Sequence, residues 1–333
     1  MTMLIDSMVE RAKADKKTIV LPEGHDDRIL AAAEETLKQG IADLVILGDA
    51  EEINAKGYNL EGAEIINPAT SDKVDEFASL LFELRKKKGM TEEEARELVT
   101  KDNIYFATMM VKTGQCDGLV GGASCATVKI LSPALKVLKT APGAPMVSSL
   151  FLMEVPNCDL GENGVFAFAD CALEIQPTAE KLAHIANLTN QSFKRLLGKE
   201  ARIALLSHSS HGSAKNDDAQ KVVDAMTYIK ENYPDLNADG ELQLDAAIIP
   251  EVGASKAPGS PVAGKANTLI FPDLDAANIG YKLVQRLAGV EKDSAESLIG
   301  HIRVGLGDHA LIAVQVLKAV YSCVRHLRPL LFP

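Results

Sequence analysis

The chain has 333 residues, of which 47% are hydrophobic and 24% charged, and its formal net charge is −11 at pH 7. This length suits two domains of about 150 residues each, and the composition is that of a folded globular protein rather than a disordered chain. The acidic balance argues against nucleic acid as a partner, because proteins that bind a duplex usually present a basic face.

The five cysteines are scattered along the chain, at Cys116, Cys125, Cys158, Cys171 and Cys323. None forms a C-x-x-C pair or stands at zinc-ligand spacing from a histidine, so we expect no metal site. Such thiols are typical of a reducing compartment, and no secretory signal follows Met1, so we expect a cytoplasmic protein. The longest apolar run, Ala310 to Val324, contains Gln315 and Lys318 and is too short to cross a bilayer, so we expect no membrane association.

In the first half of the chain, short apolar runs alternate with segments of helical period. Strands are expected at Thr18–Leu21, Leu44–Leu47 and Gly118–Gly121, and helices at Arg28–Lys38 and Val74–Lys86. Thr91 and Glu94 form a capping box, which predicts the start of a further helix.

The second half repeats this alternation. Strands are expected at Met146–Val155, Val165–Ala169, Ile203–Leu206, Ala246–Ile249 and Thr268–Phe271, and helices at Thr178–Leu197, Ala219–Asn232 and Asn278–Ala288. Strands that are almost continuously apolar and separated by helices predict an α/β fold with largely parallel sheets covered on both faces. Turn residues at Ala141–Ala144 indicate a domain boundary. Active sites of such sheets lie beyond the carboxyl ends of the strands.

A serine-rich segment, Leu205–Lys215, joins a predicted strand to a predicted helix. Its small hydroxyls and Gly212 would let backbone N–H groups approach an oxyanion near the start of the helix. The alternative is that the serines only cap the helix. His208 and His211 flank these serines and are interpreted as surface residues rather than metal ligands.

A second loop, Ala254–Asn267, contains two prolines, two glycines and two lysines between predicted buried strands. A long structured loop at a strand end is more often functional than not. Gly259, Gly264 and Lys265 have the spacing of a phosphate-binding P-loop, but Ala266 replaces the metal-binding hydroxyl and the loop leads into a strand. We therefore reject that motif.

Several segments together resemble the phosphate acetyltransferase family, also called phosphotransacetylase or phosphate acetyl/butyryl transferase. The segments that carry the resemblance are Leu21–Glu23 with Arg28, Glu83–Arg85, Gly121–Ala123, Leu135–Thr140, Val155–Cys158, Phe168–Asp170, Gly212–Lys215, Asp239–Gln243, Ser255–Val262, Phe271–Leu274, Asn278–Lys282 and Gln285–Leu287. They extend over roughly residues 1 to 291. The proline–glycine loop followed by Phe-Pro-Asp-Leu is the most specific pairing among them.

The resemblance implies two α/β/α domains like those of isocitrate and isopropylmalate dehydrogenases, with a cleft between the domains. The first domain would comprise residues 1–143 with about 295–333, and the second, inserted domain residues 144–294. The implied reaction interconverts acetyl phosphate and coenzyme A with acetyl-CoA and phosphate, by attack of the thiolate on the acyl carbonyl. Coenzyme A would be a substrate, no cofactor would be bound permanently, no metal would be needed, and the protein would be a homodimer.

The same resemblance implies a set of site residues. Arg85, at the end of a helix, matches a phosphate-binding arginine, although an arginine in that place is commonly a solvated surface residue. Cys158 and Lys129 would lie near the cleft, and Cys158 can equally be read as a buried thiol. The two loops would bind substrate and phosphate through Ser207, Ser209, Gly212, Ser213, Lys256, Gly259 and Ser260.

Two departures from the family stand out. Cys125, Lys129 and Ser132 occupy positions where the family shows a histidine, an acidic residue and an arginine. Lys129 can supply positive charge but cannot form the bidentate hydrogen bonds of an arginine. Beyond Glu291, nothing in residues 292–333 matches the Ser-Arg motif and later Asp of the family, so the catalytic residues are left unknown. Ser297, Arg303 and Asp308 are nearby candidates to which no role is assigned.

The departures leave alternatives open. The tail reflects either a shifted reading frame in the gene or true divergence. The chain is then an acetyl transferase, a phosphate butyryltransferase, or a catalytically impaired homologue that still binds coenzyme A or acyl phosphate. An NAD-dependent dehydrogenase of the same fold is less favoured. Gly305–Ala310 resembles a dinucleotide-binding fingerprint, but too few residues follow it to complete a βαβ unit.

Overall fold

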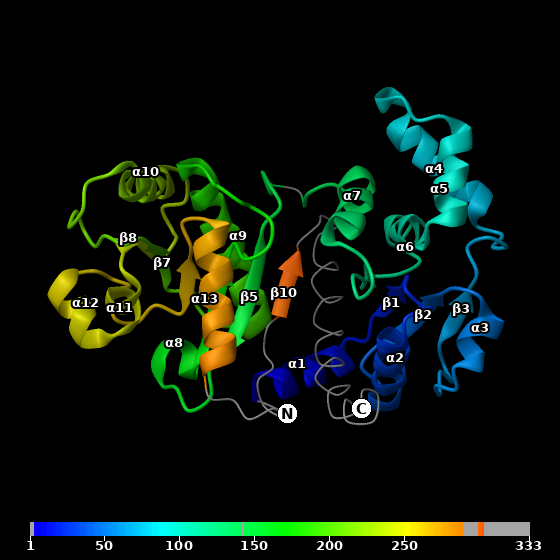
Figure 1. Cartoon of the computed structure of the whole chain (residues 1–333), viewed down its shortest axis with the longest axis horizontal. Coiled ribbons are helices and arrows are strands. Elements are labelled where there is room, and N and C mark those ends of the chain that lie inside the picture. The colour runs from blue at the N-terminus through cyan, green and yellow to red at the C-terminus, as the bar shows by residue number, and fades with distance from the viewer. Residues whose placement is uncertain (1–2, 142, 289–298, 303–333) are drawn as a thin grey trace. The chain divides into compact units, whose positions relative to one another are not determined.

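The computed structural model describes residues 3–141, 143–288 and 299–302 (Figure 1). The chain divides between Gly143 and Ala144 into two compact units, which are considered one at a time. None of the helices in the described ranges is both long enough and apolar enough to cross a membrane.

The first unit contains a four-stranded sheet in the order β3-β2-β1-β4. Its strands are β1 (Thr18–Leu21), β2 (Asp43–Leu47), β3 (Glu64–Ile66) and β4 (Gly118–Leu119). Every neighbouring pair is parallel. The order places β4 on the opposite side of β1 from β2, so the direction of winding reverses between β1 and β4. In open α/β sheets, that reversal is where ligands commonly bind.

Helices cover both faces of this sheet. They are α1 (Met3–Ala14), α2 (Asp27–Gln39), α3 (Ala50–Ala55), α4 (Val74–Arg85), α5 (Glu92–Lys101), α6 (Asn103–Lys112) and α7 (Thr127–Val137), with a 3₁₀ turn, η1, at Lys86–Lys88. Alternate strand residues point to opposite sides: Ile19 packs in a cluster with Leu30 of α2, and Val20 packs with Phe77 and Phe106 of α4 and α6. Two buried faces explain why these strands are apolar throughout.

The second unit contains a six-stranded sheet in the order β10-β5-β6-β9-β7-β8. Its strands are β5 (Ser149–Glu154), β6 (Val165–Ala169), β7 (Ile203–Leu206), β8 (Ala238–Leu242), β9 (Thr268–Ile270) and β10 (Ile299–Ile302). Four of them, β6 to β9, are parallel, while β5 is antiparallel to both β6 and β10. The prediction of an α/β fold with largely parallel sheets is therefore confirmed.

The helices of the second unit are α8 (Leu160–Asn163), α9 (Ala179–Leu197), α10 (Asp217–Asn232), α11 (Leu244–Ile248), α12 (Pro250–Lys256) and α13 (Leu274–Leu287). The sheet face that carries Phe168, Ala204 and Leu269 packs against α11 and α13. Helices α9 and α10 also contact the strands of this sheet (Figure 1).

One predicted strand and one predicted domain boundary differ from the structure. The run Ala246–Ile249 was expected to be a strand, but its first three residues lie in the short helix α11, and Ile249 joins this helix to α12, which begins at Pro250. A four-residue apolar run does not distinguish a strand from a buried helical turn, which is why this prediction was wrong. The strand β10 pairs with β5 and so lies in the second unit, whereas the predicted boundary at about 295 put it in the first domain. The rest of residues 295–333 lies outside the described residues.

Candidate functional site

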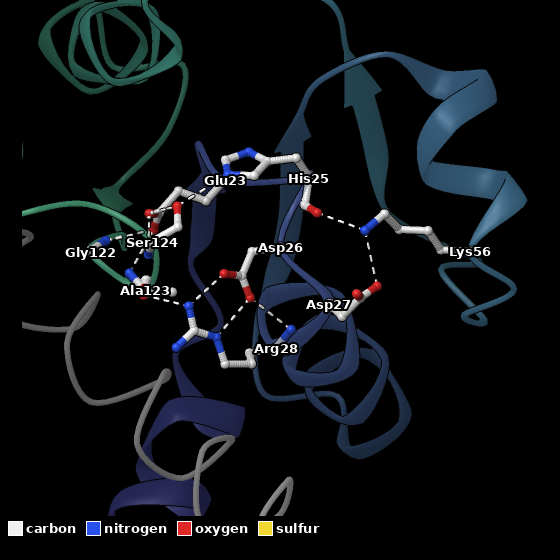
Figure 2. A network of polar contacts seen from close by, with 9 residues as sticks. All are labelled: Glu23, His25, Asp26, Asp27, Arg28, Lys56, Gly122, Ala123 and Ser124. Atoms are coloured by element: carbon white, nitrogen blue, oxygen red, sulfur yellow. Dashed lines mark hydrogen bonds and ion pairs between the residues drawn. The ribbon is translucent and has the colours of Figure 1, made fainter. Parts of the chain in front are cut away.

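The carboxyl ends of β1 and β4 are joined by a buried carboxylate. Glu23 follows β1 and is only 3% exposed. Its Oε2 accepts hydrogen bonds from the backbone N–H groups of Gly122 (2.6 Å) and Ala123 (2.9 Å). Its Oε1 accepts from the N–H (2.8 Å) and the hydroxyl (2.7 Å) of Ser124. Three successive N–H groups that converge on one anion form a nest of the kind that holds phosphates in other proteins. Here the protein's own carboxylate fills it (Figure 2).

These bonds favour the ionised form of Glu23. Burial alone would raise the pKa of its carboxyl, but the hydrogen bonds from Ser124, Ala123 and Gly122 outweigh it and hold the pKa below its ordinary value. The neighbouring Arg28 pairs with Asp26 at 2.6 Å and donates to the carbonyl of Ala123 at 2.5 Å. The resemblance segments around Glu23, Arg28 and the Gly121–Ala123 loop are thus one polar network (Figure 2).

Arg85 lines a cavity of about 620 Å³ in the first unit. It is the last residue of α4, and the cavity is also lined by Lys88 of η1, Lys136 of α7 and Tyr105 of α6. Within the described part of the chain, neither Arg85 nor Lys88 is paired with a carboxylate, and Lys136 donates to the hydroxyl of Tyr105 at 3.4 Å. Unpaired cations from three elements around one cavity provide a favourable place for an anionic group.

The cavity is also lined by three carboxylates, and each of them has a partner. Lys101 and Glu97 pair with each other at 2.8 Å, and Glu94 completes the predicted capping box with Thr91. Asp102 accepts from the N-terminal amides of α6. Because these carboxylates already have partners, the positive charge of Arg85 and its two lysine neighbours is left available to a ligand. Sequence reasoning found Arg85 but missed Lys88 and Lys136, which reach the cavity only through the tertiary structure.

In the second unit, the serine-rich segment folds around a second buried carboxylate. Glu241 of β8 is 3% exposed, and its Oε1 accepts from the hydroxyl of Ser209 (2.8 Å) and the N–H of Gly212 (2.7 Å). The N–H of His211 donates to the backbone carbonyl of Glu241 at 3.1 Å. Ser209 is fully buried, so in this structure its hydroxyl shapes the loop.

Three further amides of the loop are bonded to its own serine hydroxyls. The N–H of Ser209 donates to Ser207 Oγ, that of Ser210 to Ser213 Oγ, and that of Ala214 to Ser209 Oγ. The serines do not cap α10, because Asn216 does so by accepting from the N–H of Ala219. The helix-cap alternative is therefore wrong. A ligand at this loop would meet its side chains, among them the partly exposed Ser207, rather than a free row of N–H groups.

Asp239 connects the two predicted substrate loops. Its Oδ2 accepts a hydrogen bond from the hydroxyl of Ser260 and lies 3.3 Å from Nε2 of His211. Ser260 Oγ in turn accepts from the N–H groups of Val262 and Ala263. The structure thus brings Ser207–Ser213 and Ser260 to the same edge of the sheet, beside β8. Asp239 and Glu241 belong to a segment that carried the family resemblance, yet neither was predicted to be a site residue.

The other predicted site residues of this unit lie nearby or in the core. Lys256 ends α12 and donates to Gln243 Oε1 (3.0 Å) and Asp245 Oδ2 (2.8 Å). Gly259 has a φ of +83°, and a Cβ there would meet nothing within 4 Å. Cys158 lines an apolar cavity of about 430 Å³ with side chains of β6 and α13. The substrate roles of these residues stay predictions.

The departures from the family lie in the first unit and in the tail. Cys125 follows the Glu23 network directly; burial and then the charge of Glu23 raise the pKa of its thiol. Lys129 is exposed in the first turn of α7, and its charge acts on Cys125 in the opposite direction. The candidates Ser297, Arg303 and Asp308 lie outside the described residues.

Comparison with known proteins decides the family. The model of the family described as "Phosphate acetyl/butaryl transferase" matches residues 3–308. The chain belongs to this family. It is 56% identical over 306 residues to the phosphate acetyltransferase of Thermoanaerobacterium thermosaccharolyticum, and this alignment covers 91% of each chain. The resemblance inferred from the sequence is therefore confirmed.

Solved structures agree with this assignment. The fold is similar to the crystal structure of a phosphotransacetylase from Streptococcus pyogenes, with a TM-score of 0.83, 36% identity and coverage of 97% of this chain and 99% of that one. A 4-hydroxythreonine-4-phosphate dehydrogenase from Klebsiella pneumoniae matches with a TM-score of 0.51 and 12% identity, covering 93% of this chain and 99% of that one. The second likeness concerns the fold alone, and the expected dehydrogenase-like fold of the family is confirmed by it.

Proposed function

We propose that this chain transfers an acetyl group between phosphate and coenzyme A. The observation that carries the proposal is membership of the family across residues 3–308, together with 56% identity to a phosphate acetyltransferase. The reaction joins the thiolate sulfur of coenzyme A to the acyl carbon of acetyl phosphate and releases inorganic phosphate. The thiol proton passes to a base, and in the reverse direction phosphate attacks the thioester. No cofactor is bound permanently, and coenzyme A is a substrate.

The cavity of Arg85 is the proposed place for the phosphates of coenzyme A. An acidic protein of net charge −11 needs local cations to attract such a polyanion. Arg85, Lys88 and Lys136 supply three at the rim of a cavity of about 620 Å³. A guanidinium can grip a phosphate through two parallel hydrogen bonds, whereas the lysines act as point charges.

The loop edge beside β8 is the proposed place for acyl phosphate. Ser207 and Lys256 are accessible there; Glu241 holds the serine-rich loop, and Asp239 contacts both loops. The groups that take the thiol proton and stabilise the oxyanion are not assigned, because the sequence contains no Ser-Arg motif after Glu291, although the family model matches as far as residue 308.

The acyl group is proposed to be acetyl rather than butyryl because the relative with 56% identity is named for acetyl. The family description covers both groups. Since a hydrophobic pocket distinguishes one methylene by only about 1–3 kcal/mol, activity with butyryl phosphate is expected to be lower rather than zero.

A homodimer in the cytoplasm is also proposed. Ile279, Leu283 and Leu287 of α13 are 59%, 53% and 75% exposed and follow one another at four-residue spacing. Such a contiguous apolar stripe on a helix is typical of a surface that pairs with another chain. Cys116, Cys125, Cys158 and Cys171 are free thiols, which supports a reducing compartment.

The test is an acyl-transfer assay on the purified full chain. Acetyl phosphate should be consumed only when coenzyme A is present, with equimolar appearance of thioester and inorganic phosphate. Calorimetric titration with coenzyme A alone separates binding from turnover. If coenzyme A binds but no thioester forms at high enzyme concentration, acetyl transfer by this chain is excluded. A version of the chain that carries the C-terminal residues of the Thermoanaerobacterium relative in place of 292–333 is the matched comparison for the tail.

A further inference from the structure

A second polar cavity of the first unit has a histidine at its edge. It has a volume of about 320 Å³ and lies at the carboxyl ends of β1, β2 and β3. His25 lines it from the end of β1, with Asp49, Lys56, Asn67 and Asn103. None of the residues predicted from the sequence to bind substrate lines this cavity.

The protonation of His25 follows from the hydrogen bonds around it. Glu23 is held in the ionised form, so its carboxylate oxygens can only accept. The hydroxyl hydrogen of Ser124 is therefore donated to Oε1 of Glu23, at 2.7 Å. Ser124 Oγ also lies 3.1 Å from Nε2 of His25. Since Ser124 has one hydroxyl hydrogen and it is already used, its oxygen must accept and Nε2 must carry the hydrogen.

In a neutral imidazole, a hydrogen on Nε2 leaves Nδ1 as a bare acceptor. Nδ1 of His25 has no hydrogen-bond partner among residues 3–141 or elsewhere in the described ranges. Lys56 and Asp26, two charged neighbours of His25, have other partners. Lys56 donates to the backbone carbonyl of His25 (2.7 Å) and to Asp27 (3.0 Å), and Asp26 is paired with Arg28. The contact between His25 and Ser124 is visible in Figure 2.

The same carboxylate fixes the beginning of α7. The segment Gly122–Ser124 leads through Cys125 and Ala126 into this helix, whose last turn carries Lys136 to the cavity of Arg85. The two oxygens of Glu23 accept four hydrogen bonds from this segment, two on each oxygen. A glutamine at position 23 would present an NH₂ group to two of these donors, leaving them unpaired.

We propose that Glu23 is a positioning residue: its carboxylate holds the glycine loop that leads into α7 and, through Ser124, keeps the hydrogen of the neutral His25 ring on Nε2, so that Nδ1 is left as an open acceptor on a residue that lines the cavity. The inference about coenzyme A below rests on the proposed function, whereas the inference about His25 does not.

The first experiment is two-bond ¹H–¹⁵N NMR of the full chain labelled in its histidines, at a pH where they are neutral. The His25 signal is assigned by its loss in His25→Gln. We expect the Nε2–H pattern in the wild type, and a mixture of tautomers or the Nδ1–H pattern in Ser124→Ala and Glu23→Gln. Ser79→Ala, an exposed serine of α4 outside the network, is the matched control and should leave the signal unchanged.

The second experiment separates the loop from the histidine. Ser124→Ala keeps the three backbone bonds to Glu23, so its amides at 122–124 should remain protected from hydrogen exchange and its KM for coenzyme A should stay near that of the wild type. Glu23→Gln should lose that protection and raise KM about fivefold or more with a smaller change in kcat, since a mispositioned α7 moves Lys136.

The outcomes are distinct. An Nδ1–H pattern for His25 in the wild type, or an unchanged pattern in both variants, overturns the assignment of the tautomer. A folded Glu23→Gln with unchanged amide exchange and unchanged KM overturns the positioning role. If the wild type itself forms no thioester, the proposed function fails, while NMR and hydrogen exchange still decide the role of Glu23.

Discussion

The hydroxyl of Ser209 donates a 2.8 Å hydrogen bond to the carboxylate of Glu241, and both side chains are buried at the centre of the serine-rich loop. Ser209 Oγ also accepts from the N–H of Ala214 at 2.9 Å. One hydroxyl therefore satisfies a buried carboxylate and a backbone donor together. The loop owes its shape to a residue on β8, 32 positions along the chain.

Replacement of Ser209 by alanine should destabilise the protein. Ser209→Ala leaves the N–H of Ala214 without its acceptor and removes a donor to Glu241, which should lower the free energy of unfolding by roughly 1–3 kcal/mol. Urea denaturation measures this. Ser255→Ala, an exposed serine of α12 in the same unit, is the control and should change it by less than about 0.5 kcal/mol. Equal effects of the two substitutions would contradict the role given to Ser209.

Arg85 should contribute to the affinity for coenzyme A. Arg85→Gln removes the guanidinium from the 620 Å³ cavity and should raise KM for coenzyme A about tenfold or more, because a hydrogen bond between charged groups contributes about 1.5–3 kcal/mol. The KM for acetyl phosphate should change much less. Arg96→Gln is the matched control, because Arg96 is exposed on α5 and pairs with Asp75. An equal rise of KM in both variants would show a general effect of net charge instead.

The folded protein should lose stability at low pH as the carboxylate of Glu23 becomes protonated. The pKa of its carboxyl is below the ordinary value in the folded protein. Its ionised form therefore stabilises the fold fully above the ordinary carboxyl pKa, and this contribution is lost as pH falls through the lowered one. The urea midpoint of the wild type should fall steeply over this acid range. The urea midpoint of Glu23→Gln should be lower than that of the wild type at pH 7 and should fall less steeply as the pH is lowered.

The control for this pH dependence is Glu61→Gln, which removes an exposed carboxylate from the same unit. Its midpoint should follow that of the wild type at every pH. Parallel curves for the wild type and Glu23→Gln would mean that Glu23 is not the group responsible.

Two glycines of the proline–glycine loop should differ in their tolerance of alanine. Gly264 has a φ of +77°, and a Cβ there would lie 2.7 Å from Cα of Pro250, whereas Gly259 has a φ of +83° and open space around it. Gly259→Ala should lower the free energy of unfolding by about 1–2 kcal/mol, because alanine is disfavoured in the left-handed backbone conformation. Gly264→Ala should cost clearly more, because the backbone of Pro250 cannot move aside. Thermal denaturation of both variants measures the difference, and equal melting temperatures would refute the close contact.

Much of the fold was predictable because it depends on local pattern. Runs such as Thr18–Leu21 are apolar throughout, as strands buried on both faces must be, and Thr91 with Glu94 marked the start of α5 as predicted. The prediction failed where the local pattern is ambiguous or absent. Ala246–Ile249 is apolar but helical, and β8, with the sequence Ala-Asp-Gly-Glu-Leu, has no strand pattern at all.

The candidate site was predictable in its residue types but not in its connections. The sequence by itself determined the α/β class, the family, the two loops and Arg85, since these depend on composition and on motifs that are contiguous along the chain. Only the tertiary structure decided that Glu241 sits inside the serine-rich loop, that Lys136 shares a cavity with Arg85, and that Glu23 meets Ser124 from 101 positions away. The physical reason is that a buried carboxylate takes its hydrogen-bond donors from whichever segments the packed sheet brings beside it, and sequence spacing does not encode that choice.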